Sequence, residues 1–380
     1  MNIAVMVVNA GSSSLKLDLL DPDDRVLAGE HVDAAPDSDQ ARQALSRFLD
    51  DVGDVDAVGH RIVHGGPDLI APVLYDQQIR AQLDGAADLA PLHVPPALAA
   101  LDAVRDRLPD LPHVICFDTA FHANLPEPAR SYAVPVEWRR RYGLRRYGFH
   151  GLSYAWAVGR TARLLDRPVE DLQLVLAHLG GGASVCAVQG GRSVWTSMGF
   201  TPLEGLPMVT RSGSVDPGML LWLQTRHGLS AEELSDGLER HSGLTGLSEG
   251  LSGDTRQLVA AARDGHRAAA LALDVYTLRL RQEVAAAASS LDRFDALVFT
   301  GEIGVDQPEI RTAVCAGLPV LGLPSTLDQR QEQDRVLARG QGRVAVALVH
   351  PREDRQIAAE TRDVLTAAGR ERRRAAMRRS

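Results

Sequence analysis

The sequence predicts an α/β protein built from two related domains. Its 380 residues exceed what one hydrophobic core ordinarily organises, so we expect two domains. Short apolar strands alternate with helical stretches rich in Ala and Leu, which is typical of α/β folds. Two segments about 170 residues apart share one design, an apolar strand, a Gly- or Ser-rich turn and a second apolar strand. They indicate one such unit in each half of the chain.

The predicted helices lie between these strands and at the C-terminal end. They are residues 95–108, 154–165, 268–291 and 354–379. Apolar residues recur at three- and four-residue spacing over residues 257–291, which fits one long amphipathic helix or two in series.

The two matching segments are VMVVNAGSSSLKLDLL (residues 5–20) and LVLAHLGGGASVCAV (residues 174–188). Gly-rich turns expose backbone N–H groups that suit phosphate oxygens, although each segment alone is equally compatible with a plain β-hairpin. Neither a GxxxxGK[ST] loop nor a dinucleotide fingerprint occurs in the chain. The first segment also carries Lys16, the one lysine among 41 basic residues.

Charge and cysteine content restrict the partners and the compartment. A net charge of −8 argues against nucleic acid as a partner. The apolar run at residues 3–8 is too short for a signal peptide, and nothing approaches a membrane span. Three widely spaced cysteines predict buried thiols in a reducing cytoplasm, and we expect the basic tail at residues 368–380 to be a solvated terminus. We therefore expect a cytoplasmic protein with no nucleic-acid or membrane partner.

Seven motifs that follow one another along the chain identify a protein family. They are NAGSSSLK (9–16), GHRIVHGG (59–66), LAPLHVPPAL (89–98), CFDTAFHANLP (116–126), YGFHGLSY (147–154), AHLGGGAS (177–184) and TSMGFTPLEGLPMVTRSGSVDPG (196–218). Together they strongly resemble the acetate kinases, the acyl-phosphate-forming branch of a superfamily that also holds sugar kinases, actin and heat-shock chaperone ATPases. The resemblance runs from about residue 5 to residue 361.

The resemblance implies a particular architecture. We expect two domains of duplicated ribonuclease H-like (actin-like ATPase) topology, an active-site cleft between them, and a homodimer. The N-terminal domain is expected at residues 1–118 plus 355–380, and the nucleotide-side domain at residues 122–351.

The implied reaction is a reversible, Mg²⁺-dependent, in-line transfer of a phosphoryl group from ATP to acetate, giving acetyl phosphate and ADP. Acetate is already a carboxylate at neutral pH, so the enzyme needs no general base. It must instead bring two anions together and stabilise the charge on the transferring group, which calls for fixed cations, N–H donors and a metal ion.

Matching each motif to the family gives candidate residues. Arg61 and Arg211 match the arginines placed across the acyl carboxylate and the phosphoryl group, for which a guanidinium fork is well suited. His150 matches the histidine that contacts the phosphoryl group, and Asp118 the acid that orders Arg, His or hydrated Mg²⁺. Asn9 and Glu353 match the residues on the Mg²⁺ side.

The remaining candidates bind substrate and nucleotide. The small acyl pocket maps to Val63, Leu92, Phe149 and Pro202, and valine at position 63 favours acetate over propionate. The nucleotide and phosphate set comprises Ser12, Ser14, Lys16, His178, Leu179, Gly180, Gly181, Gly182, Asp254, Thr255, Arg256, Gly301, Glu302, Ile303 and Gly304.

Departures from the family cluster on the nucleotide side. A loop usually close to GGIGEN reads GEIGVDQ, so Glu302 replaces a glycine and Val305 an acid. A carboxylate about 5 Å from a nucleotide phosphate costs roughly 3 kcal/mol at an effective dielectric near 20. Three interpretations stay open: Glu302 swings out toward an Arg and ATP is used; another donor such as diphosphate replaces ATP; or the protein is a catalytically weak acyl-phosphate or nucleotide sensor.

Overall fold

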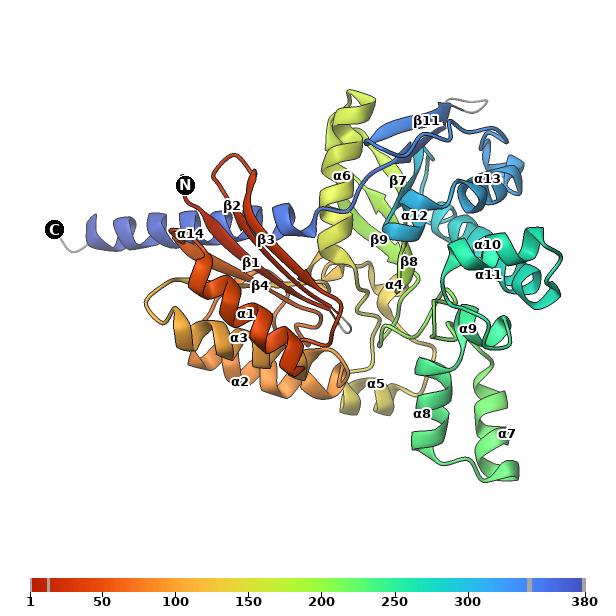
Figure 1. The fold of residues 1–380 in the computed structure, drawn as a ribbon, viewed down its shortest axis with the longest axis horizontal. Helices are drawn as coiled ribbons and strands as arrows, with labels where there is room; N and C mark the ends of the chain where they lie inside the picture. Colours follow the sequence, from red (N-terminus) through yellow and green to blue (C-terminus); the bar gives the residue numbers. More distant parts are fainter. Residues whose placement is uncertain (1, 12–13, 340–343, 378–380) are drawn as a thin grey trace. The chain divides into compact units, whose positions relative to one another are not determined.

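Two six-stranded sheets organise the chain in the computed structural model, which describes residues 2–11, 14–339 and 344–377 (Figure 1). One compact unit comprises residues 1–123, 149–156 and 352–380, and the other residues 124–148 and 157–351. Residues 149–156 thus belong to the first unit, whereas the sequence placed them in the second domain. The reason is local: the Gly151 N–H donates to the Asp118 carbonyl oxygen at 3.0 Å.

The two sheets repeat one strand order. The first runs β3-β2-β1-β4-β6-β5 and the second, read from its other edge, β9-β8-β7-β10-β12-β11. The strands of the first sheet are β1 (Val5–Ala10), β2 (Leu15–Leu20), β3 (Val26–Val32), β4 (Ala57–Ile62), β5 (Val73–Leu74) and β6 (His113–Phe117). The second sheet holds β7 (Gln173–Leu179), β8 (Ala183–Gln189), β9 (Arg192–Thr196), β10 (Ala296–Thr300), β11 (Arg335–Arg339) and β12 (Ala345–Leu348).

Pairing directions repeat as well. An antiparallel meander opens each sheet, and its first strand then pairs in parallel with a later one, β1 with β4 and β7 with β10. The paired hairpins predicted at residues 5–20 and 174–188 are confirmed as β1–β2 and β7–β8. The duplicated α/β topology is therefore present in the structure.

The predicted helices are found with small shifts at their ends. They are α3 (Val94–Arg107), α6 (Gly151–Leu165), α11 (Arg267–Ala288) and α14 (Glu353–Met377), and the stretch from residue 257 proves to be two helices in series, α10 (Thr255–Arg263) and then α11. The other helices are α1 (Asp39–Asp51), α2 (Gln77–Ala86), α4 (Glu127–Arg130), α5 (Val136–Tyr142), α7 (Pro217–His227), α8 (Ala231–Arg240), α9 (Gly243–Leu247), α12 (Glu302–Asp306) and α13 (Pro308–Ala316). Within the described ranges, no helix is both long enough and apolar enough to cross a bilayer.

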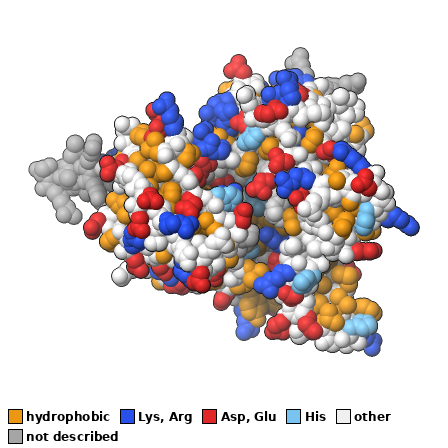
Figure 2. All heavy atoms as spheres, viewed as in Figure 1, with side chains coloured by type: hydrophobic (Ala, Val, Ile, Leu, Met, Phe, Trp, Pro, Cys, Tyr) orange, Lys and Arg blue, Asp and Glu red, His pale blue; other side chains and the backbone are white. Residues whose placement is uncertain are grey.

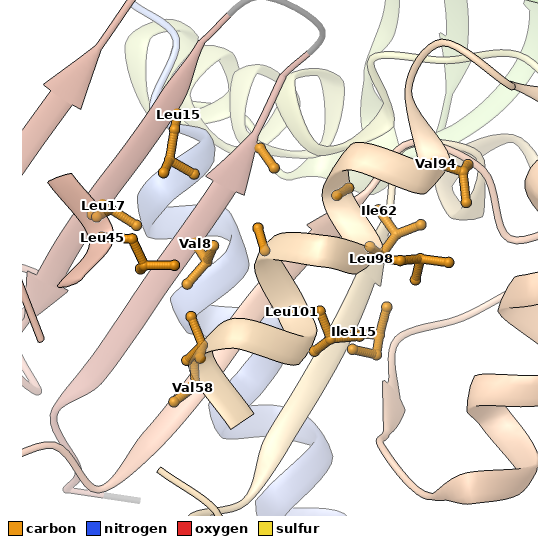
Figure 3. Close-up of a cluster of buried hydrophobic side chains, with 14 of the residues drawn as sticks. Val8, Leu15, Leu17, Leu45, Val58, Ile62, Val94, Leu98, Leu101 and Ile115 are labelled. Atoms are coloured by element: carbon orange, nitrogen blue, oxygen red, sulfur yellow. The ribbon is translucent and has the colours of Figure 1, made fainter. Parts of the chain in front are cut away.

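Alternation along β1 gives the first sheet two different faces. Met6 and Val8 pack with residues of α1 and α3, including Leu45, Leu98 and Leu101 (Figure 3). Val5 and Val7 face the other way and pack against α14. Because successive side chains alternate, Asn9 lies on the α14 face, at the end of its strand.

A buried histidine pair lies among the polar contacts of the first sheet. Nε2 of His113 lies 2.9 Å from the Leu108 carbonyl oxygen, which can only accept, so this nitrogen carries the proton. Nδ1 of His113 must then accept from Nε2 of His60 at 2.9 Å. This leaves Nδ1 of His60 an unprotonated nitrogen that has no hydrogen-bond partner among the described residues. Burial lowers the pKa of His60 well below its usual value, and His113 and Arg105 add to the effect.

The pair predicts that stability falls in mild acid. Below about pH 6.5 the unfolded histidines bind protons that the folded pair excludes, so the free energy of unfolding should drop by up to about 1.4 kcal/mol per pH unit for each proton. Thermal melts between pH 7.5 and 5 measure this slope. His60→Gln, which keeps a donor for His113, should flatten it, while His227→Gln on exposed α7 should not. Equal slopes in all three proteins would contradict the assignment.

Candidate active site

Three predicted catalytic and metal-side residues meet where β1, β4 and β6 end. Asn9 and Arg61 are paired in register on parallel strands, and Asp118 follows β6 directly. Arg61 forks onto the Asp118 carboxylate, with Nε 3.1 Å from Oδ1 and Nη2 2.6 Å from Oδ2. Its third nitrogen, Nη1, donates to Oδ1 of Asn9 at 3.1 Å. The parallel strands thus bring residues more than 50 positions apart to one edge of the sheet.

This ion pair is buried. Asp118 is 1% exposed, and the side chain of Arg61 is 12% exposed. Burial raises the pKa of the Asp118 carboxyl, and the charge and bonds of Arg61 oppose that effect. Burial works against the Arg61 charge too, but the carboxylates of Asp118 and Glu353 outweigh it and raise the guanidinium pKa. The result is a fixed cation whose orientation is set by its two bonds to Asp118 and its bond to Asn9.

Glu353 reaches the same cluster from the first residue of α14. Its Oε2 accepts a hydrogen bond from Nδ2 of Asn9 at 2.8 Å. The structure therefore brings together the two residues expected on the metal side. A carboxylate and an amide supply the oxygen donors that Mg²⁺ prefers, with water completing its shell. Across the described residues there is no group of three or more His, Cys, Asp or Glu side chains that could hold a metal ion.

The first of the two turns predicted to bind phosphate follows β1 directly. The Gly11 N–H donates to the Ser14 carbonyl oxygen at 2.8 Å, and Ser12 lies outside the described residues. Lys16 of β2 is the cross-strand partner of Asn9, so both side chains lie on the face of the sheet that α14 covers. The single lysine thus lies on the strand next to Asn9, one of the two predicted metal-side residues.

His150 occupies a strained turn immediately before α6. Its φ is +61°, an uncommon conformation for a residue with a Cβ. The turn is held because the Gly151 N–H bonds to the Asp118 carbonyl oxygen, and a Cβ on Gly151 would lie only 2.2 Å from that atom. The carbonyl oxygen of Phe149 is 3.0 Å from Nε2 of His122. Asp118 therefore fixes Arg61 with its side chain and the His150 turn with its main chain.

Residues expected in the acyl pocket occur in both units. In the first unit Val63 and Phe149 are buried, and Leu92 is 41% exposed. The rings of Phe149 and His64 form a T-shaped contact, with centroids 5.5 Å apart. In the second unit Nη1 of Arg211 donates to the Pro202 carbonyl oxygen at 2.9 Å, so these two predicted residues touch. Burial lowers the pKa of Arg211, and Glu239 opposes the effect from 3.9 Å.

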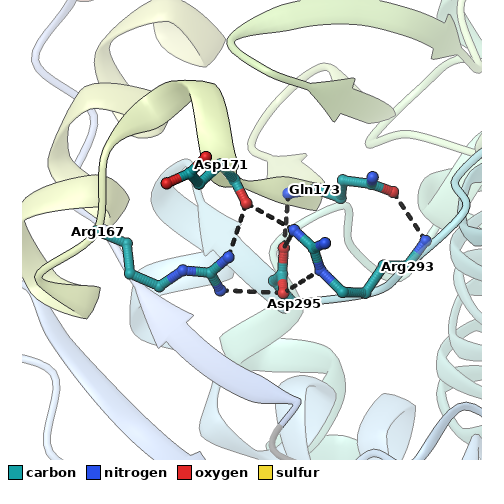
Figure 4. Close-up of polar contacts among 5 residues, drawn as sticks. All are labelled: Arg167, Asp171, Gln173, Arg293 and Asp295. Atoms are coloured by element: carbon teal, nitrogen blue, oxygen red, sulfur yellow. Dashed lines mark hydrogen bonds and ion pairs between the residues drawn. The ribbon is translucent and has the colours of Figure 1, made fainter.

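The nucleotide candidates of the second unit form adjacent turns. His178 is the penultimate residue of β7 and pairs with Thr300 of β10. The Gly180 N–H closes the glycine turn onto the Gly182 carbonyl oxygen at 2.9 Å. Gly301 has φ +81°, and a Cβ there would lie 2.4 Å from the Leu179 carbonyl oxygen. These contacts place the segments 178–182 and 301–304 side by side. At the opposite end of the same strands Asp295 forms ion pairs with Arg167 and Arg293, and hydrogen bonds to Asp171 and Gln173 complete this polar cluster (Figure 4).

Glu302 is exposed as the first residue of α12. Together with Asp306 it contributes to raising the pKa of Arg256, whose main partner is Asp254. Arg256 and Asp254 form a forked pair with Nη2 2.8 Å from Oδ2, and Asp254 also caps α10. Thr255 is buried at the start of that helix. Glu302 thus lies within electrostatic reach of a guanidinium.

One supporting residue was missed by the sequence reasoning. Arg311 of α13 is 1% exposed, and its Nη1 donates to the carbonyl oxygens of Gly304 and Val305. Arg311 therefore stabilises the backbone of α12 through these two hydrogen bonds. The signal in the sequence was an arginine flanked by the apolar residues Ile310, Ala313 and Val314 of this helix.

Fold and site together define the class. The duplicated sheet order, with cations and small turns at the strand ends, is that of a phosphotransferase with the actin-like ATPase fold. The chain belongs to the acetokinase family, whose model matches residues 38–359, and it is accordingly an enzyme that phosphorylates a carboxyl group. It is 48% identical over 320 residues to an acetate kinase of Deinococcus deserti, covering 82% of this chain and 79% of that protein.

Solved structures agree with this placement. The acetate kinase of Porphyromonas gingivalis superposes with a TM-score of 0.86 at 34% identity, over 96% of this chain and all of that one. A propionate kinase from Francisella tularensis gives the same TM-score at 30% identity, over 95% of this chain and all of that one.

Contact between the His150 turn and Asp118 can be tested with glycine variants. Gly151→Ala should lower the free energy of unfolding by about 2 kcal/mol and reduce turnover, because its methyl group overlaps a backbone oxygen. Gly159→Ala in the same helix is the matched control, since a Cβ there meets nothing closer than 4.0 Å. Denaturant melts and activity assays would contradict the packing if the two variants behaved alike.

Proposed function

We propose that the enzyme transfers the γ-phosphoryl group of ATP to acetate, reversibly and by direct in-line attack, giving acetyl phosphate and ADP. The observation that carries the proposal is the buried fork of Arg61 on Asp118, which extends through Asn9 to Glu353. This chain offers fixed positive charge at the end of a sheet, which is what joining two anions requires. A carboxylate acceptor needs no base to ionise it.

Each side chain then has a defined task. Arg61 and Arg211 bind the acetate carboxylate and stabilise the charge of the transferring phosphoryl group. His150 donates to the phosphoryl oxygens, and Asp118 orients both Arg61 and the His150 turn. In this proposal nucleotide phosphates bind to His178 and the turn of Leu179, Gly180, Gly181 and Gly182, to Ser12, Ser14 and Lys16, and to the backbone of the turn formed by Gly301, Glu302, Ile303 and Gly304. Asp254, Thr255 and Arg256 lie on the adenosine side.

Mg²⁺ fits the pair formed by Asn9 and Glu353. When bound, it would neutralise part of the charge on the nucleotide phosphates. The residues themselves supply one carboxylate and one amide oxygen, and Arg61 already bonds to that amide oxygen. Asn9 would therefore be shared between the cation of the protein and the metal.

Acetate is the proposed acceptor, with propionate as a poorer one. Val63 and Phe149 are buried, so packing fixes the two side chains that we propose as the pocket wall in the first unit. One methylene is worth only about 1–3 kcal/mol in such a pocket. Val63, Leu92, Phe149 and Pro202 are its proposed lining.

A hydroxamate assay for acetyl phosphate tests the reaction. With millimolar acetate and Mg²⁺, ATP should support product formation, and propionate should give a lower kcat/KM than acetate. Diphosphate is assayed in parallel as the alternative donor. Product with diphosphate alone would replace ATP in the proposal, and no product with either donor would favour the sensor reading.

Glu302 decides how well ATP binds. Because its side chain is exposed and within electrostatic reach of Arg256, we propose that it turns away from the nucleotide. Glu302→Gly should then leave the KM for ATP within about twofold of the wild-type value. If the carboxylate instead obstructed ATP at a cost of roughly 3 kcal/mol, its removal should lower the KM for ATP by a large factor. Steady-state kinetics distinguish these results, and Glu309→Gln on the neighbouring helix is the control.

We also propose a homodimer in the cytoplasm. Helix α7 exposes Met219, Leu221 and Trp222 by 41%, 62% and 53%, and hydrophobic side chains gather at the lower right of Figure 2, where α7 and α8 lie. Apolar surface of this kind is common where protein chains associate. Light scattering should give twice the mass of one chain, and Leu221→Asp should lower the measured mass. A monomeric wild type would contradict the proposed dimer.

The cytoplasmic location is proposed from the cysteines. Cys116, Cys186 and Cys315 are buried thiols, which suits a reducing compartment.

A further inference from the structure

Three side chains clamp the loop of residues 196–206 in the second unit. The Tyr132 hydroxyl bonds to Oε2 of Glu204, and Nη2 of Arg146 donates to Oε1 of the same carboxylate at 2.6 Å. Nη1 of Arg146 donates to the carbonyl oxygens of residues 197 and 198, at 2.8 and 2.9 Å. Both carboxylate oxygens of Glu204 are therefore engaged.

The clamp lies directly against the loop backbone. The Phe200 N–H donates to the Tyr132 hydroxyl oxygen at 2.8 Å. A Cβ on Gly199 would lie 1.7 Å from Oε2 of Glu204 and 2.2 Å from the Tyr132 hydroxyl, so only glycine allows this approach. The hydroxyl thus accepts from the backbone and donates to the carboxylate at once. Burial raises the pKa of Tyr132, and its bond to Glu204 adds to this, so the phenol keeps its proton at neutral pH.

The clamped loop carries the contact between Pro202 and Arg211. Beyond Pro202, the Gly205 N–H donates to Oγ of Ser214 at 3.0 Å, so the loop is held on both sides. The Pro202 carbonyl oxygen, between these two anchors, accepts from Nη1 of Arg211 at 2.9 Å. Movement of the loop would therefore move both the pocket lining and the bound guanidinium.

We infer that Tyr132 and Glu204 are positioning residues that set both turnover and the choice of acyl group. They hold the loop from which Pro202 orients Arg211 and lines the acyl pocket. The inference rests on the proposed function, because the roles of Pro202 and Arg211 are those assigned there. Neither side chain needs to touch a substrate: a displacement of about 1 Å at a reacting group can cost about a hundredfold in rate.

Tyr132→Phe tests the inference by removing one oxygen atom, and Glu204→Gln gives a second variant that keeps the shape of the side chain. We expect kcat with acetate to fall about tenfold or more in each. The KM for ATP should stay within about twofold, and the ratio of kcat/KM for acetate to that for propionate should change by about threefold or more. Tyr142→Phe removes a hydroxyl from an exposed tyrosine of the same unit and should change none of these values.

Two results would overturn the inference. In one, Tyr132→Phe and Glu204→Gln keep the wild-type kcat and the wild-type acetate-to-propionate ratio. In the other, their rates fall only in proportion to the folded fraction seen in thermal melts, with the ratio unchanged. A wild-type enzyme that forms no acyl phosphate would instead refute the proposed function, so the two failures are distinct.

Discussion

The buried fork of Arg61 on Asp118 is the interaction on which the first unit's site depends. It fixes a cation at the end of β4 and, through Asn9, reaches the first residue of α14. Breaking such a pair by removing one partner costs several kcal/mol, because the other charge stays buried. Asp118 also accepts the backbone hydrogen bond that holds the strained His150 turn. Asp118 therefore positions both the Arg61 guanidinium and the His150 turn.

Duplication explains why the candidate residues occur at corresponding places in both sheets. In each sheet the first hairpin ends in a small-residue turn, and the parallel neighbour of its first strand ends next to it. Asn9 is paired with Arg61 in one sheet and His178 with Thr300 in the other. Backbone pairing thus provides the positions, and the sequence of each copy decides which chemistry occupies them.

Much of this was predictable from the sequence. The strand–turn–strand pattern gave both hairpins, and helical periodicity located α3, α6, α11 and α14 to within a few residues. The motifs of the family pointed to Arg61, Asp118 and Asn9, which the structure brings together. The sequence could not show that residues 149–156 join the first unit, since a backbone bond to Asp118 decides it. The sequence could not show the contacts of Arg311 and Glu204 either, because they involve carbonyl and hydroxyl groups that only the fold brings close.

The most direct measurement is a double-mutant cycle on turnover with Arg61→Ala, Asp118→Ala and the double variant, each checked for folding by thermal melting. If Asp118 acts mainly by orienting Arg61, Arg61→Ala should lower kcat/KM by orders of magnitude. The double variant should then be scarcely worse than Arg61→Ala alone, because coupled residues are not additive. Near-normal turnover in folded Arg61→Ala, or strictly additive losses, would contradict the account.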